Sequence, residues 1–177
     1  MAQGPLPIPV DARELIRHME WADSSVLRAV LAHAPAHEDG RLRDLLVHLH
    51  GVQAAFLAIW ASRALPEPPA EPPTLAQIAA FARGCHAEVP AMIAQWGQAD
   101  LSRPIRMPGL EPYERQIGRP FDSPTLAETV VQVATHSTYH RGQVNARLRE
   151  IGGEPPLVDF IAWIWFGRPA PEWSGIA

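Results

Sequence analysis

The 177-residue chain has little of what marks several common classes of protein. Its one cysteine, Cys85, excludes an intrachain disulfide and is typical of a reducing compartment. The chain has 15 Lys and Arg residues and 19 Asp and Glu residues, which give a net charge of -4. We therefore expect no surface that binds nucleic acid. No basic-then-apolar leader opens the chain, and no apolar run approaches about 20 residues. We therefore expect a cytoplasmic protein that neither spans a membrane nor follows that export route.

The sequence also lacks several catalytic signatures. It has no Glu-x-x-His pair of the kind that builds a di-iron centre, and no His-Glu-x-x-His segment. The serine nucleophile elbow, the phosphate-binding glycine loop and the dinucleotide fingerprint are missing too. No segment shows strand-like alternation as strong as the helical periodicity. These absences leave helices as the main feature of the chain.

Apolar residues make up 47% of the chain and recur at helical intervals. Start and stop signals divide this pattern into four long helices and a short, very apolar one. The expected helices cover about 11–34, 40–65, 74–97, 125–151 and 157–166. The predicted fold is an all-α four-helix bundle with a short C-terminal helix, forming a single domain over residues 1–177.

The remaining segments are predicted to connect or flank these helices. Residues 1–9 and 167–177 are expected to be extended tails, and the proline-rich stretch 66–73 a stiff linker. Residues 98–122 have no helical period and are expected to form a loop with a possible short hairpin. A helix as apolar as 157–166 needs cover on most sides, which predicts a homodimer contact there.

Two histidines four residues apart carry the strongest functional signal. On a helix, His136 and His140 lie about 40° and one turn apart, so both rings project from one face. That face belongs to a helix with a clear apolar stripe: Leu126, Val130, Val133, Val144, Leu148 and Ile151. Each buried imidazole needs a partner to offset its desolvation. The pair therefore indicates a divalent-metal site, with hydrogen-bonded core histidines as the alternative.

The helix over 40–65 offers a third ligand. His48 and His50 are two residues apart and point about 160° apart, so only one can face the pair. The apolar stripe of Leu45, Val52 and Phe56 is expected to turn His48 inward and to leave His50 on the outer flank. Three histidines leave a metal with open coordination positions, as catalytic sites do.

Neighbouring polar residues are expected to orient these rings. Asp44 lies one turn before His48, and Gln143 lies one turn beyond His140, so both are predicted as supporting groups. Arg141 points away from His136 and is expected at the outer surface, as is Tyr139. His33 and His37 share the ligand spacing, but Pro35 ends the helix between them, so they are not predicted as a site.

Several segments of the chain are similar to one known family. The resemblance rests mainly on the closing stretch His136-Ser-Thr-Tyr-His140-Arg-Gly-Gln143, followed by Leu148-Arg-Glu-Ile-Gly-Gly-Glu-Pro-Pro and Asp159-Phe160-Ile161. The segments Leu45-Leu46-Val47-His48-Leu49 and Met19-Glu20-Trp21-Ala22 add to it. Together they resemble the DinB-like family of helical bundles.

This resemblance implies a metal-binding function. It implies a four-helix bundle, often dimeric, in which His48, His136 and His140 bind a divalent metal, usually zinc or nickel. Related branches include S-transferases and an isomerase that use small thiols, so a thiol and a small electrophile are the expected partners. A metal-dependent hydrolase and a non-catalytic metal-binding or small-ligand-binding protein remain alternatives. The linker 66–73 and the loop 98–122 match no branch, so the substrate stays unassigned.

Overall fold

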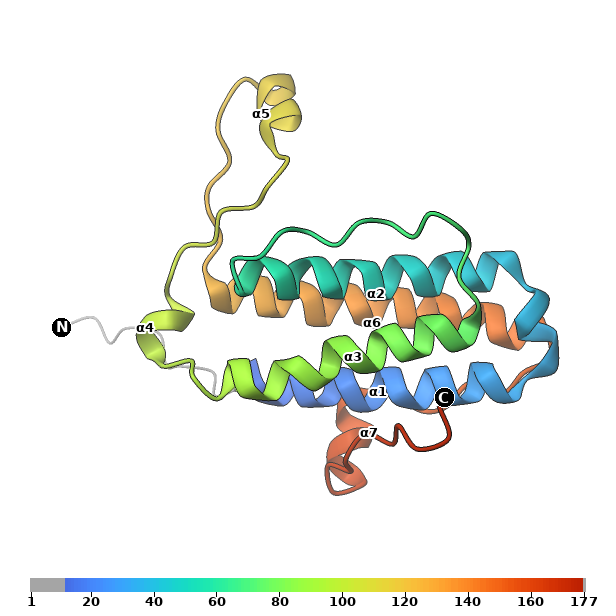
Figure 1. The fold of residues 1–177 in the computed structure, drawn as a ribbon. Coiled ribbons are helices and arrows are strands. Elements are labelled where there is room, and N and C mark those ends of the chain that lie inside the picture. The colour runs from blue at the N-terminus through green and yellow to red at the C-terminus, as the bar shows by residue number, and fades with distance from the viewer. Residues whose placement is uncertain (1–11, 177) are drawn as a thin grey trace.

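The computed structural model describes residues 12–176, and its main feature is a bundle of four long helices (Figure 1). These are α1 (Ala12–Ala32), α2 (Gly40–Trp60), α3 (Leu75–Ile93) and α6 (Leu126–Glu150). Helix α6 contacts both α1 and α2, and α3 covers the same two helices. The described part of the chain contains no β-strand. The predicted all-α four-helix bundle is therefore confirmed. Residues 1–9, predicted as a tail, lie outside the described residues.

Helices α2, α3 and α6 begin where side chains can satisfy their first backbone N–H groups. The Asp39 carboxylate accepts a hydrogen bond from the Leu42 backbone at 2.7 Å, after the short 3-10 helix η1 (Ala34–Glu38). Thr125 and Glu128 form a capping box at the start of α6, as Thr74 and Gln77 do for α3. The helix starts thus follow from local sequence.

The segment 98–122 differs from its prediction. It contains two short helices, α4 (Gln98–Leu101) and α5 (Glu111–Ile117), in place of a hairpin. Pro112 suits the first turn of α5, and Gly118 ends it in the left-handed conformation with φ of 74°. One isolated bridge between Pro104 and Thr125 closes the base of the segment. Helix α5 stands away from the bundle (Figure 1).

The C-terminal region returns to α1. Helix α7 (Phe160–Trp165) is shorter than predicted and buries Trp163 against Trp21. The following segment has no helix, but it contacts the bundle instead of extending freely. Its Trp173 Nε1 donates to Glu20 Oε1 at 3.0 Å, and Ile176 is buried in the core. Exposed apolar side chains remain around α7, so the homodimer stays a prediction: Leu157, Ile161, Trp165 and Phe166.

Two of the apolar clusters in the interior lie on either side of a polar layer. One cluster includes Val26, Leu46 and Val144, and the other includes Met19, Leu57 and Val133. Between them, at the same level of all four long helices, lie buried polar side chains. We call these residues the polar layer: Asp23, His50, Gln53, His86, Ser137 and Arg141.

The Asp23 carboxylate is the centre of the polar layer. Its Oδ1 accepts a hydrogen bond from Arg141 Nη1 at 2.8 Å. Its Oδ2 accepts from Gln53 Nε2 at 2.7 Å and from His86 Nε2 at 3.0 Å. Gln53 Nε2 also donates to Ser137 Oγ at 2.9 Å. One carboxylate thereby connects α1 to α2, α3 and α6.

Two predictions about exposure are wrong because of this layer. Arg141 was expected at the surface, but only 2% of it is exposed, since its charge is paired with Asp23. His50 was expected on the outer flank, but it is buried, with Nδ1 donating to Gln53 Oε1 at 3.0 Å. A helical wheel places polar residues outside, and it does not show a polar layer inside. Tyr139 is exposed as predicted.

Opposing effects act on the ionisation of Asp23. Burial alone would raise the pKa of the carboxyl group, because it disfavours the charged form. The Arg141 guanidinium and the hydrogen bond from His86 outweigh burial and hold the pKa of Asp23 well below its usual range. The carboxylate is therefore charged at neutral pH and is matched by a buried cation.

Among residues 12–176, α2 alone has the length and composition of a membrane-crossing helix. This is a weak indication, because the core helix of a bundle passes the same test. Leu42, Leu46 and Leu49 of α2 are fully buried against the other helices. Its apolar character is thus accounted for by the bundle core.

Replacing Asp23 should strongly destabilise the bundle. Asp23→Asn leaves the Arg141 charge buried without a counterion, which is expected to lower the free energy of unfolding by about 3–5 kcal/mol. Urea denaturation at pH 7 measures this, with the exposed Asp44→Asn as control, expected within about 0.5 kcal/mol of the parent.

The difference in the free energy of unfolding between the parent and Asp23→Asn is expected to depend on pH. Because the folded-state pKa of Asp23 is lowered, its stabilisation is complete above the unfolded-state pKa of about 3.9 and is lost as the pH falls below it. The stability difference between parent and Asp23→Asn should therefore narrow below about pH 4. A difference under about 1 kcal/mol at pH 7 would contradict the central role of Asp23.

Candidate metal centre

Helices α2 and α6 run antiparallel, and side-chain bonds fix their register. Arg147 Nη2 donates to Asp39 Oδ2 at 2.6 Å, and Gln53 Nε2 donates to Ser137 Oγ at 2.9 Å. His48 lies between Asp39 and Gln53 in the chain, and His140 lies between their partners Ser137 and Arg147. A third bond between these helices runs from Trp60 Nε1 to Thr129 Oγ1 at 3.0 Å, at the C-terminal end of α2.

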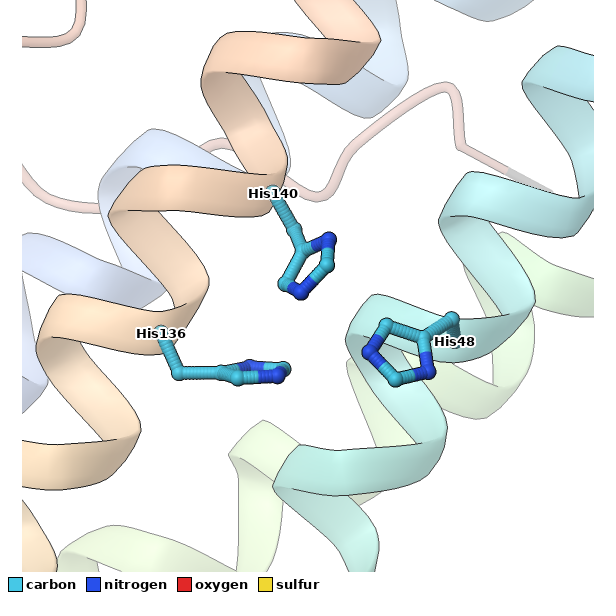
Figure 2. A group of neighbouring side chains, drawn as sticks. All are labelled: His48, His136 and His140. Atoms are coloured by element: carbon cyan, nitrogen blue, oxygen red, sulfur yellow. The ribbon is translucent and has the colours of Figure 1, made fainter.

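This register brings the three predicted ligands together. The ring centroids of His48 and His140 are 4.4 Å apart, those of His136 and His140 are 4.3 Å apart, and those of His48 and His136 are 5.2 Å apart. One nitrogen from each ring lies within 4.8 Å of the other two. Figure 2 shows each ring turning a nitrogen toward the space between them. The imidazoles thus form one cluster from two helices.

The cluster suits a divalent metal. Imidazole nitrogens bind zinc at about 2.0–2.1 Å, which in a tetrahedral site places them about 3.4 Å apart, so the rings need move only slightly inward. Partial burial lowers the pKa of His48 and of His136 below the ordinary value, and neighbouring imidazoles lower both further. Neutral rings with free lone pairs are what a metal requires.

The solvent side of the cluster is open. His48 is exposed, whereas His136 and His140 are half-buried. The residues of the cluster are all histidines, so it holds no carboxylate among the described residues. Three neutral protein ligands with a solvent-facing side leave room for a further ligand on the metal, as in catalytic sites.

Gln143 supports one of the rings directly. Its Oε1 accepts a hydrogen bond from His140 Nδ1 at 2.7 Å. The proton is then on Nδ1, which leaves Nε2 as the nitrogen with a lone pair. Asp44 is exposed, and its side chain makes no hydrogen bond or ion pair within residues 12–176. The geometry therefore favours Gln143 over Asp44 as the group that orients the site.

His136 has a buried ring nitrogen without a partner among the described residues. Its Nδ1 is shut off from solvent and has no hydrogen-bond partner within residues 12–176. Such a group is uncommon in folded proteins and raises the cost of burying the ring. A bond from this ring to a metal would offset part of that cost.

His33 and His37 make contacts with backbone carbonyl groups away from the cluster. His33 Nε2 contacts the Ile151 carbonyl at 2.9 Å, and His37 Nε2 contacts the Leu31 carbonyl at 3.1 Å. These two rings do not join a ligand cluster among the described residues. The choice of His48 over His50 agrees with the cluster, but its stated reason is wrong, because His50 is the buried residue of the two.

Sequence reasoning missed the polar layer behind this site, although a signal for it exists. Asp23 continues the core spacing of Met19, Val26 and Val30, and His86 does the same between Ala82 and Val89. A charged or polar residue at such a core position predicts a buried partner in another helix. Reading those positions as part of the core would have indicated the layer.

Comparisons with known proteins agree with the fold. The sequence model of the DinB family, a family with a helical bundle fold, matches residues 9–172, nearly the whole chain. A search of curated proteins gave no significant match.

Removing the hydrogen bond from Gln143 should weaken metal binding. Gln143→Leu is expected to lower zinc affinity by about 10–100-fold, because His140 loses the group that fixes its tautomer and ring orientation. Competition with a chromophoric zinc chelator measures the affinity. The matched control is Asp44→Asn, expected to bind as the parent does. An equal loss of zinc affinity in both variants would assign Asp44 the same role as Gln143. Unchanged zinc affinity in Gln143→Leu would show that Gln143 does not support the site.

Proposed function

The chain belongs to the DinB family, and from this we propose that His48, His136 and His140 bind a divalent metal, zinc or nickel, which activates a small thiol for transfer to an electrophile. The observation that carries the proposal is the convergence of three imidazoles from α2 and α6 with an open solvent side.

The residues of the chain would have distinct tasks. The three imidazoles supply neutral ligands, and Gln143 keeps the proton of His140 on Nδ1 so that Nε2 faces the ion. A bound metal lowers the pKa of a coordinating thiol and holds it as the thiolate, the reactive form. The exposed side at His48 gives a small thiol and its electrophile access.

Thiol chemistry is favoured over hydrolysis by what surrounds the imidazoles. A metal hydrolase commonly uses a carboxylate base beside its bound water. The cluster contains no carboxylate, and the nearest sequence candidate, Asp44, is exposed and without a hydrogen bond in the described structure. Burial raises the pKa of Cys85 to about 11, so this residue is a neutral thiol at pH 7. In the proposed reaction, the reactive sulfur would come from a second molecule.

A thiol-dependence assay tests the proposal. Zinc- or nickel-loaded protein is expected to accelerate consumption of 1-chloro-2,4-dinitrobenzene or a maleate ester with one of glutathione, cysteine or coenzyme A. His140→Ala should fall to the uncatalysed rate, because the ion loses a ligand, whereas His37→Ala should keep full activity. Thiol-adduct formation is followed by absorbance and mass spectrometry, with background rates subtracted.

Three outcomes would contradict transfer of a thiol. Acceleration equal in parent and His140→Ala would remove the imidazole cluster from the reaction. Hydrolysis of p-nitrophenyl acetate without added thiol, lost in His140→Ala, would favour the hydrolase. No turnover, combined with a melting temperature that rises on metal loading, would indicate a non-catalytic metal-binding protein.

A further inference from the structure

A second candidate site lies under the proline-rich segment 65–73, which we call the strap. The strap runs along α2 before the chain enters α3 (Figure 1). Residues of the strap, α2 and α3 line a cavity of about 450 Å³, within the usual range for small-molecule sites. None of the three clustered histidines lines this cavity, so it is a different site from the candidate metal centre.

Two features of the sequence keep this cavity open. Gly51 is in the middle of α2, where glycine is unfavourable compared with alanine, and it lines the cavity. A Cβ atom added at Gly51 would meet nothing within 4 Å. Five of the eight residues in 66–73 are proline, which keeps the strap extended, and no hydrogen bond within residues 12–176 joins the strap to α2. The space is therefore formed by a missing side chain on α2 and a stiff segment above it.

The lining of the cavity is mainly apolar and reaches the protein surface. Val47 and Ala55 of α2 and Ile78 of α3 form part of it. Two large apolar side chains of the lining remain exposed, Leu65 of the strap at 45% and Phe81 of α3 at 44%. A ligand with an apolar body would be stabilised here, because binding would remove apolar surface of both partners from water. The lining therefore favours a molecule whose larger part is apolar.

The charge beside the cavity has one sign. Glu67 of the strap is the one acidic residue of the lining, and no Lys or Arg of the described chain lines the cavity. Glu67 is exposed and makes no hydrogen bond or ion pair within residues 12–176. Arg63, two residues before the strap, is bonded to Glu88 of α3 at 2.7 Å. A cationic group on a ligand would therefore be attracted by Glu67, and an anionic group would be repelled.

We propose that the cavity under the strap binds an organic amine whose apolar body lies between α2, α3 and the strap, and whose protonated nitrogen pairs with Glu67. Because Glu67 is exposed, the ammonium group stays in contact with water, which avoids the cost of burying a charge. The proposal does not depend on metal binding or on thiol transfer.

A matched pair of ligands tests the proposal. Isothermal titration calorimetry at pH 7 with 1-naphthylmethylamine is expected to show one site per chain. The alcohol 1-naphthalenemethanol, which has a hydroxyl group in place of the ammonium group, should bind about threefold more weakly, the size of effect that an exposed ion pair gives. Glu67→Gln should bind the two probes equally and keep the affinity of the parent for the alcohol. The matched control is Glu71→Gln, which should keep the preference, since Glu71 is also an exposed strap residue but does not line the cavity.

Three further variants locate the bound probes. Gly51→Leu fills the cavity and should abolish binding of both probes. Gly84→Leu should bind them as the parent does, since Gly84 is also inside a helix with open space around it but does not line the cavity. His140→Ala should bind the amine as the parent does, which excludes coordination of the amine nitrogen at the imidazole cluster.

Several results would overturn the proposal. The parent would bind neither probe, or would bind the amine and the alcohol equally. Glu67→Gln would keep the preference for the amine, or Glu71→Gln would lose it. Gly51→Leu would keep its affinity for the probes, or His140→Ala would lose its affinity for the amine. The comparison of Glu67→Gln with Glu71→Gln changes only exposed side chains, so it decides the proposal even if Gly51→Leu fails to fold.

Discussion

The buried carboxylate of Asp23 is the interaction on which the arrangement of the helices depends. It accepts hydrogen bonds from Arg141, His86 and Gln53, so every long helix has one fixed point at the same level of the bundle. Apolar contacts alone allow helices to slide by a turn with little loss, because one aliphatic side chain replaces another. A buried charge with a single matching cation does not allow it, since any shift would leave both groups unpaired in the interior.

The fixed register has a direct consequence for function. Gln53 connects the Asp23 carboxylate to Ser137, the residue immediately after His136, and Arg141 immediately follows His140. The inward-facing residues of α6 are thus bonded to the polar layer while their neighbours face outward beside α2. The imidazole cluster and the polar layer are two sides of the same turns of helix.

The sequence predicts the long helices and the pair His136 and His140, because both follow from spacing along one helix at a time, whereas the convergence of His48 on this pair depends on a second helix. The capping box at Thr125 and the pairing of His136 with His140 are local in this sense. The polar layer is not local, since burial of Arg141 makes physical sense only beside Asp23, 118 residues away. The exposure of His50 was wrongly predicted for the same reason, because its burial depends on the polar layer. Short helices at 98–122 were missed because four to seven residues are too few to establish a period.

The central claim is that three imidazoles from two helices hold one metal ion, and anomalous diffraction tests it most directly. Crystals of untagged protein, reconstituted separately with zinc and nickel, would be measured above and below each absorption edge. The account predicts one strong anomalous peak per chain, at bonding distance from His48, His136 and His140. The absence of a peak at these residues after reconstitution, or a peak at another place on the chain instead, would contradict the claim.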